Sequence, residues 1–149
     1  MFRHPIFVIV RATNLGKSLL TADVMRKVAR VLGLTPNDSQ AASSEDAAQQ
    51  PYLEVTNEEN TELDLSDYDL TAHAGVLLDG VGNARFLKKN REVLQGRPKV
   101  CKGGKSGTMI YAYPFTLRRR AVVATFDLSA ANLRMLRTDH WLSDARNVL

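Results

Sequence analysis

Three short apolar runs constrain the fold of this chain more than any other feature. They are Ile6–Val10, Ala74–Leu78 and Ala121–Phe126, and each consists almost entirely of aliphatic residues. A strand that is buried on both faces has this continuous apolar pattern, which is typical of parallel sheets. The first run is followed by a polar turn and then by Lys17–Leu32, where apolar residues recur at helical spacing up to Gly33. This order predicts half of a βαβ unit, and hence an α/β fold with a mainly parallel sheet.

The remaining segments are expected to complete a single domain, residues 1–149. Residues 36–51 are rich in Ala, Ser and Gln and predict a flexible surface insertion. In the first helix, the apolar residues that recur at helical spacing are Leu20, Val24, Val28, Val31 and Leu32. The other expected elements are a short strand at Tyr52–Thr56, a helix at Ala84–Leu94, a loop or hairpin over Gln95–Gly107, a hairpin arm at Thr108–Thr116 and a helix at Ala130–Arg137.

Composition and charge narrow the class of protein. The run Ile6–Val10 is far shorter than the roughly 20 residues of a membrane span, so no membrane partner is expected. The single cysteine, Cys101, cannot form an internal disulfide, which suits an intracellular location, nuclear if the host is a eukaryote. Residues 36–70 carry ten of the sixteen acidic residues and no Lys or Arg, so the remainder is strongly basic. Such a surface is compatible with a phosphate-bearing partner or with a merely solvated face.

The strongest local signal is the loop Arg11-Ala-Thr-Asn-Leu-Gly-Lys-Ser18. It resembles the phosphate-binding pattern G-x-x-x-x-G-K-[ST], in which backbone N–H groups and a helix N-terminus surround phosphate oxygens. Lys17 would contact the β- and γ-phosphates and Ser18 would offer its hydroxyl to Mg²⁺. Arg11 stands in place of the first glycine and would be strained if that position needs a positive φ. A chance turn before a helix is the alternative. The predicted nucleotide-binding residues are Thr13, Asn14, Leu15, Gly16, Lys17 and Ser18.

Acidic residues end the second and third apolar runs. Asp79 follows the second run, and ligands of open α/β sheets bind at the carboxyl ends of strands, so Asp79 is the predicted metal-site acid together with Ser18. The alternative is that Asp79 only starts an Asp-Gly turn. The third run ends in Thr125 and Asp127, where a polar group would sense the γ-phosphate or place the attacking water. Capping of the next helix by Asp127 or Ser129 is the alternative. The predicted catalytic residues are Lys17, Asp79 and Asp127.

A second Gly-Lys-Ser sequence, Gly104–Ser106, is interpreted differently. Lys99 stands where a phosphate loop would have its first glycine, and no apolar strand precedes it. We therefore expect a basic turn that binds DNA phosphates, with Tyr111 and Tyr113 close enough to stack on bases. A solvated surface loop is the alternative. The predicted DNA-binding residues are Lys99, Lys102, Gly103, Gly104 and Lys105.

Taken in order, these motifs resemble the helicase domain of superfamily 3, the AAA+-type ATPase of viral and transposon replication initiator proteins. The resemblance covers roughly residues 5–133 and rests on Asn14–Ser18, Val76–Asp79, Lys102–Gly104 and the strand Val122–Phe126. It implies a three-layer P-loop sandwich that binds ATP and Mg²⁺ and works as a homo-oligomeric ring, with a basic hairpin loop that grips single-stranded DNA. The sequence departs from the family pattern at Arg11, at Gly80 in place of a second acid, and at Phe126 or Asp127 in place of asparagine.

The resemblance implies an ATP-dependent DNA helicase module. The departures leave two alternatives: a catalytically inactive nucleic-acid-binding remnant of such a domain, or a small P-loop kinase.

Overall fold

The computed structural model of this chain describes residues 6–11, 17–34, 50–56, 63–103, 111–118 and 120–149, and leaves the side chains of residues 11, 17 and 18 undescribed. The predicted insertion at residues 36–51 therefore lies almost wholly outside the described residues, as do Gly104 and Lys105 of the basic turn.

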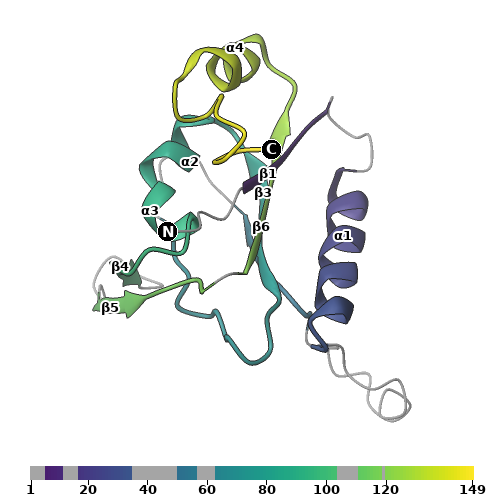
Figure 1. The fold of residues 1–149 in the computed structure, drawn as a ribbon, viewed down its shortest axis with the longest axis vertical. Coiled ribbons are helices and arrows are strands. Elements are labelled where there is room, and N and C mark those ends of the chain that lie inside the picture. Colours follow the sequence, from purple (N-terminus) through teal and green to yellow (C-terminus); the bar gives the residue numbers. More distant parts are fainter. Residues whose placement is uncertain (1–5, 12–16, 35–49, 57–62, 104–110, 119) are drawn as a thin grey trace.

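A four-stranded parallel sheet forms the centre of the molecule (Figure 1). Its strands are β1 (Ile6–Arg11), β2 (Leu53–Thr56), β3 (Gly75–Val81) and β6 (Ala121–Asp127), in the spatial order β1-β6-β3-β2. All three pairings are parallel. The predicted α/β class with a mainly parallel sheet is thus confirmed. Most residues of the apolar runs in β3 and β6 are buried on both faces, as is typical of central parallel strands.

Helices lie on both sides of this sheet. Helix α1 (Lys17–Val31) lies on one side, and α2 (Arg85–Lys89) and α3 (Arg91–Leu94) lie on the other (Figure 1). Successive strand residues point to opposite faces, and two apolar clusters reflect this alternation: Leu77 and Val123 belong to the α1 cluster, whereas Val76 and Val122 belong to the cluster on the opposite side. Helix α4 (Ala130–Thr138) contributes Met135 and Leu136 to that opposite cluster.

Helix α1 packs mainly through residues other than the five whose spacing predicted the helix. Its buried residues are Thr21, Ala22, Met25 and Ala29, whereas Leu20, Val31 and Leu32 are exposed and Val24 and Val28 are partly buried. Apolar residues occur all round this helix, so periodicity alone does not select a face, and small alanines allow the helix to lie close to the sheet. The end of the helix is as predicted: Gly33 has φ +68°, and the Leu34 N–H bonds the Ala29 carbonyl, as in a Schellman cap.

The helix expected at Ala84–Leu94 is broken into α2 and α3 at Asn90. The Asn90 side-chain amide and its backbone N–H both donate to the Phe86 carbonyl, at 3.0 and 3.1 Å. A short polar side chain that bonds the backbone of its own helix competes with helix continuation, which accounts for the break.

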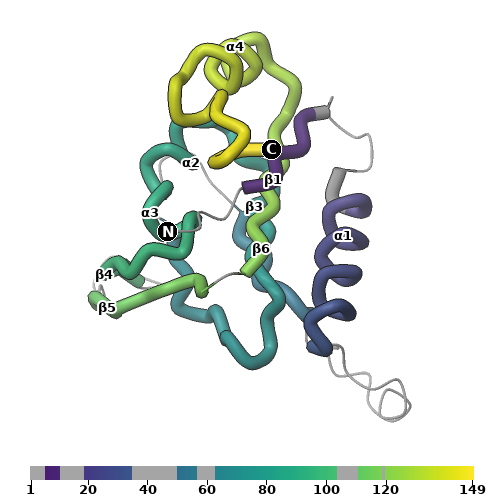
Figure 2. The backbone as a smooth tube through the Cα atoms, in the orientation of Figure 1, coloured from purple at the N-terminus to yellow at the C-terminus, as the bar shows by residue number. Residues whose placement is uncertain are grey.

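Two further pairings complete the described fold. Strands β4 (Lys99–Gly103) and β5 (Tyr111–Phe115) form a separate antiparallel hairpin, one of the two forms expected for Gln95–Gly107. The C-terminal residues return to the free edge of β1, where Val148 pairs in parallel with Ile6 (Figure 2). No described helix is both long enough and apolar enough to cross a membrane.

Candidate functional site

The carboxyl ends of the four strands meet at one end of the sheet, because all of them run parallel. Arg11 at the end of β1 is the register partner of Asp127 at the end of β6. Thr56 at the end of β2 is the register partner of Asp79 in β3. Two of the predicted catalytic residues, Asp79 and Asp127, therefore lie at the same end of the sheet.

A β-bulge shapes β3 at this end. Leu78 pairs with Ala124 and Val81 pairs with Phe126, so Asp79 and Gly80 together oppose the single residue Thr125. Gly80 has φ +67°, the left-handed region that favours glycine. Bulges of this kind redirect a side chain and are frequent beside functional sites.

The hydroxyl of Thr125 holds the bulge together. It donates to Oδ1 of Asp79 at 2.6 Å and accepts the Gly80 N–H at 2.8 Å. Thr125 is fully buried, so its hydroxyl needs both partners. The carboxylate of Asp79 is thereby oriented by the neighbouring strand, a contact that the sequence did not predict. The sequence predicts Thr125 only as one of two polar residues at the end of the strand.

Helix α1 begins on the same face and at the same end. Leu77 and Val123 pack under α1, and Asp79 and Thr125 come two residues later on the same strands. Met25 lies against Gly75, the first residue of β3 and thus at the amino end of the sheet. Lys17 precedes Met25 by eight residues, about 12 Å along the helix axis at 1.5 Å per residue. The first turn of α1 therefore starts near the level of Asp79.

Arg11 does not suffer the strain that a positive φ would impose. It is the last residue of β1, and Arg118 is the one non-glycine residue with positive φ in the described part of the chain. The substitution of arginine for the first glycine of the phosphate-loop pattern therefore costs no backbone strain. Residues 13–16 and the side chains of Lys17 and Ser18 lie outside the described residues.

The sheet topology also indicates that a ligand would bind at the carboxyl end of the sheet. Strands β1 and β6 are neighbours, yet the helix after β1 packs on one face and the helix after β6 packs on the other. Where the connections of adjacent strands diverge in this way, open α/β sheets bind ligands in the crevice beyond the strand ends. In this sheet the crevice lies beyond Arg11 and Asp127, the last residues of β1 and β6.

Asn132 of α4 fixes the loop that follows the bulge. Its buried side chain accepts the Ala84 N–H and donates to the Gly82 carbonyl, both at 3.1 Å. Its own N–H donates to the hydroxyl of Ser129, which caps α4. Ser129, one of the two predicted capping residues, is thus confirmed in that role. Sequence reasoning did not identify Asn132, because its partners lie about fifty residues away.

Metal binding by protein side chains alone finds no support in the described residues. Among them, no group of three or more His, Cys, Asp or Glu side chains could hold an ion. A magnesium ion that binds with a nucleotide needs only one or two protein ligands, since phosphates and water supply the others. Asp79 fits that smaller requirement.

The basic hairpin has one face toward the molecule and one toward solvent. Cys101, Gly103, Tyr113 and Phe115 share the inner face, while Val100, Lys102 and Pro114 share the exposed one. Of the predicted DNA-binding residues, Lys102 is exposed, Lys99 forms a long ion pair of 3.8 Å with Glu92, and Gly103 is buried.

Tyr113 anchors the hairpin, whereas it was expected to be available for stacking on bases. Its hydroxyl accepts the Leu65 N–H at 2.9 Å and donates to Asp64 at 3.1 Å. Burial, reinforced by the hydrogen bond to Asp64, raises the pKa of the Tyr113 phenol well above its usual range, so it stays protonated and keeps donating. Tyr111 is exposed, as stacking would require.

No protein-family model, curated protein or solved structure matches this chain.

Proposed function

We propose that this chain is an ATP-binding and ATP-hydrolysing helicase module of the superfamily 3 type, built as a three-layer P-loop sandwich. ATP and Mg²⁺ would bind at the carboxyl end of the sheet between β1 and β6, and single-stranded DNA would bind the basic hairpin. The observation that carries the proposal is the Asp79–Thr125 hydrogen bond of 2.6 Å, on the face where α1 begins. A carboxylate held at the carboxyl end of a strand, on the face where a helix begins, suits the binding of a metal-bound phosphate.

Each residue then has a distinct role. The backbone of residues 13–16 would surround the phosphates, Lys17 would offset their charge, and Ser18 and Asp79 would hold Mg²⁺. The bound ion would neutralise charge that develops on the phosphates. Thr125 acts through Asp79 as a positioning residue, and Asp127 is placed at the strand end where a water could be oriented. A homo-oligomeric ring would let the hairpins of several copies contact one strand of DNA.

A second candidate function is nucleotide-dependent DNA binding without hydrolysis. The observation that favours it is the conformation of Gly80, which occupies the position of the second acid. Its φ of +67° and its hydrogen bond to Thr125 suit glycine, and an acidic side chain there would be strained. In this case ATP would regulate DNA binding but would not be consumed.

ATP binding and ATP turnover, measured with and without oligo-dT, separate these functions. Lys17→Ala should weaken ATP binding about 10- to 150-fold, the equivalent of the roughly 1.5–3 kcal/mol of a charged hydrogen bond. Lys27→Ala, an exposed lysine farther along α1, is the matched control and should bind ATP normally.

A second pair of variants tests the orientation of Asp79. Thr125→Val removes the hydroxyl and should reduce turnover more than ATP affinity, whereas Thr125→Ser keeps the hydroxyl and should retain most turnover. ATP binding that is sensitive to Lys17→Ala but shows no turnover would support the second candidate. A wild-type chain that binds no ATP would overturn both candidates.

A further inference from the structure

We propose that the root of the hairpin, formed by Lys99, Val100, Pro114 and Phe115, is a nucleotide-binding cradle for single-stranded DNA. A base would enter a hollow beside Phe115, and the adjoining phosphates would contact lysines on the other side of β4. This inference rests on the proposed DNA-binding role of the hairpin and extends it from the turn to the root. Its basis is a pair of hollows that share one wall.

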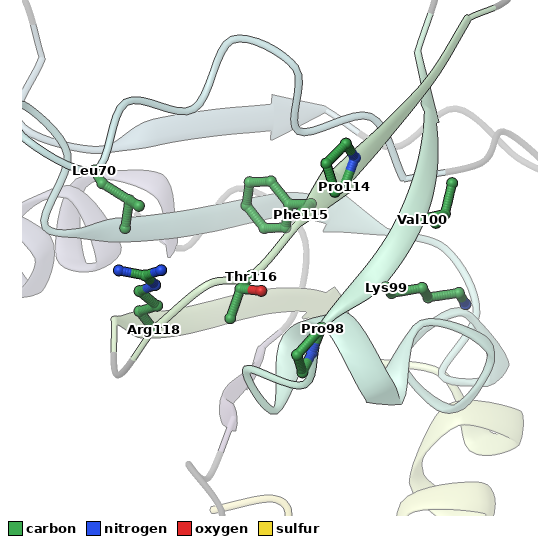
Figure 3. A pocket seen from close by; sticks show the side chains of 8 residues that line it. All are labelled: Leu70, Pro98, Lys99, Val100, Pro114, Phe115, Thr116 and Arg118. Atoms are coloured by element: carbon green, nitrogen blue, oxygen red, sulfur yellow. The ribbon is translucent and has the colours of Figure 1, made fainter.

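The first hollow lies between the hairpin root and Leu70 (Figure 3). Its volume of about 490 Å³ is within the usual range for small-molecule pockets, roughly 300–1,000 Å³. Figure 3 shows Phe115 and Pro114 along one side, Pro98 and Thr116 along the other, and Arg118 beside Leu70 at one end. An aromatic ring and two prolines present flat apolar surfaces, and a cation stands at the end of the hollow. Such a site suits a planar base that carries an anion.

The second hollow lies across β4 and is smaller, about 190 Å³. Three of its lining residues are lysines, namely Lys89, Lys99 and Lys102. Lys99 and Val100 line both hollows and so form the wall between them. Val100 is 66% exposed on this wall. A strand of DNA that crosses the wall at Val100 would reach the apolar hollow on one side and the lysines on the other.

The charge of the whole segment identifies the class of ligand. Residues 95–126 contain seven Lys or Arg residues and no Asp or Glu. Glu92, which approaches Lys99 at 3.8 Å, precedes the segment, and both side chains are partly exposed, so their attraction is weak. A polyanion would balance the positive charge of this segment. The apolar hollow, in addition, requires a base that is free to enter it, and the bases of a duplex are stacked inside the double helix. Single-stranded DNA meets both requirements.

A substitution of Arg118 tests the role of the cation in DNA binding without destabilising the fold. Its φ of +32° lies outside the ordinary region for an L-residue, and it is exposed. Arg118→Gly therefore removes the cation from the hollow and relieves the backbone, so it should not destabilise the fold. We expect this variant to bind oligo-dT about fivefold more weakly, with a salt slope lower by about 0.7, the value for one phosphate contact on a single strand. Arg30→Ala, an exposed cation at the end of α1 on the other side of the sheet, is the matched control and should bind normally.

The base contact needs its own measurement. An oligo-dT that carries 5-iodouracil should photo-crosslink to Phe115. Val100→Ser, which shortens an apolar side chain between the two hollows, should reduce the yield of this crosslink. An abasic oligonucleotide of the same length should bind the wild-type chain at least fivefold more weakly than oligo-dT, because base stacking contributes to binding.

The outcomes separate the two levels of the proposal. If the wild-type chain binds no oligo-dT, the proposed DNA-binding role fails and the cradle fails with it. If it binds oligo-dT but Arg118→Gly binds equally well and crosslinks map only to Tyr111, the cradle is wrong and the hairpin turn is the site. Competition by polyglutamate as effective as that by oligo-dT, with no preference over the abasic strand, would also overturn the cradle.

Discussion

Single polar side chains inside apolar segments do much to organise this molecule. Thr125 lies in β6, whose only other polar residue is Asp127 at its end, and the Thr125 hydroxyl joins Asp79 to Gly80 on the neighbouring strand. A buried hydroxyl without partners would cost about 1–3 kcal/mol, so its presence in such a run indicates that partners exist. Asn132 serves the next loop in the same way through Gly82 and Ala84.

His73 is a second polar residue with a defined structural role. Its Nδ1 accepts the Asp69 N–H at 2.9 Å, so this nitrogen must be unprotonated. Burial lowers the pKa of His73, and the nearby Asp69 carboxylate opposes that shift only in part. The folded chain therefore binds a proton at His73 less readily than the unfolded chain, whose His73 pKa stays near the ordinary value of 6.5.

We predict that the free energy of unfolding decreases as the pH falls below about 6.5, the ordinary pKa of histidine. In that range the unfolded state takes up the proton first, and linkage requires stability to fall until the pH passes below the lowered pKa of the folded state. Urea unfolding at a series of pH values between 7.5 and 5 measures the slope. His73→Gln should flatten the slope, while His140→Gln, a change at an exposed histidine, should keep it. A His73→Gln profile identical to that of the wild type would contradict the prediction.

At the scale of elements, the contact between β3, β6 and α1 is unusually close at one point. A Cβ atom at Gly75 would lie 2.2 Å from the Ala121 carbonyl oxygen and 2.9 Å from Cε of Met25. The Met25 side chain could move away from such a Cβ atom, but the Ala121 backbone could not, because it is paired in the sheet. The absence of a side chain at Gly75 therefore allows the strands to pair and α1 to pack across them.

Gly75→Ala should lower the free energy of unfolding by about 1–3 kcal/mol or more, the range for overpacked cores. Chemical denaturation measures the loss. Gly33→Ala is the comparison, since a Cβ there meets nothing within 4 Å and only the φ of +68° opposes it.

Asparagine tolerates the left-handed region better than alanine. Gly33→Asn should therefore recover part of the stability lost in Gly33→Ala, whereas Gly75→Asn should be at least as harmful as Gly75→Ala. Recovery at Gly75 would show that steric contact with β6 is not the cause.

At the scale of the whole molecule, the two ends of the described chain stabilise each other. The Ile6 N–H donates to the Asn147 carbonyl, the Val8 N–H to the Leu149 carbonyl, and the Leu149 N–H to the Ile6 carbonyl, at 2.7–2.9 Å. The Asn147 side chain also accepts from buried Gln95 at 2.8 Å. The free edge of β1 is covered by this return of the chain, which limits pairing with other molecules.

Removal of residues 147–149 should lower the free energy of unfolding by about 2–4 kcal/mol, since each of three backbone hydrogen bonds contributes roughly 1 kcal/mol and a buried glutamine loses its acceptor. It should also promote association through the exposed edge of β1. Thermal unfolding and light scattering measure the two effects. Leu149→Ser keeps the backbone bonds and changes an exposed side chain, so its stability should stay within about 0.5 kcal/mol of the wild type. Equal losses in both variants would contradict the role of backbone pairing.

Local sequence patterns predicted the elements of this fold well in two cases: where a strand is buried on both faces, and where a glycine marks a turn or the end of a helix. The runs that became β3 and β6 are almost wholly apolar because both faces of these central strands are covered, and Gly33 ended α1 because only glycine adopts its conformation easily. The run that became β1 is equally apolar, although Phe7 on this edge strand is exposed. The hairpin agrees with the loop or hairpin expected over Gln95–Gly107 and with the hairpin arm expected at Thr108–Thr116. The spacing of apolar residues predicted that α1 is a helix but did not select its buried face, because apolar residues surround that helix.

By itself, the sequence determined that a parallel sheet would form and that polar residues would end its strands, since these features depend on neighbours a few positions apart. Only the tertiary structure decided that β6 lies between β1 and β3, which brings Thr125 to Asp79. It also decided that Tyr113 anchors the hairpin and that a hollow opens at the hairpin root. The physical reason is that similar apolar strands can pair in several orders, and the chosen order depends on packing between residues far apart in the chain.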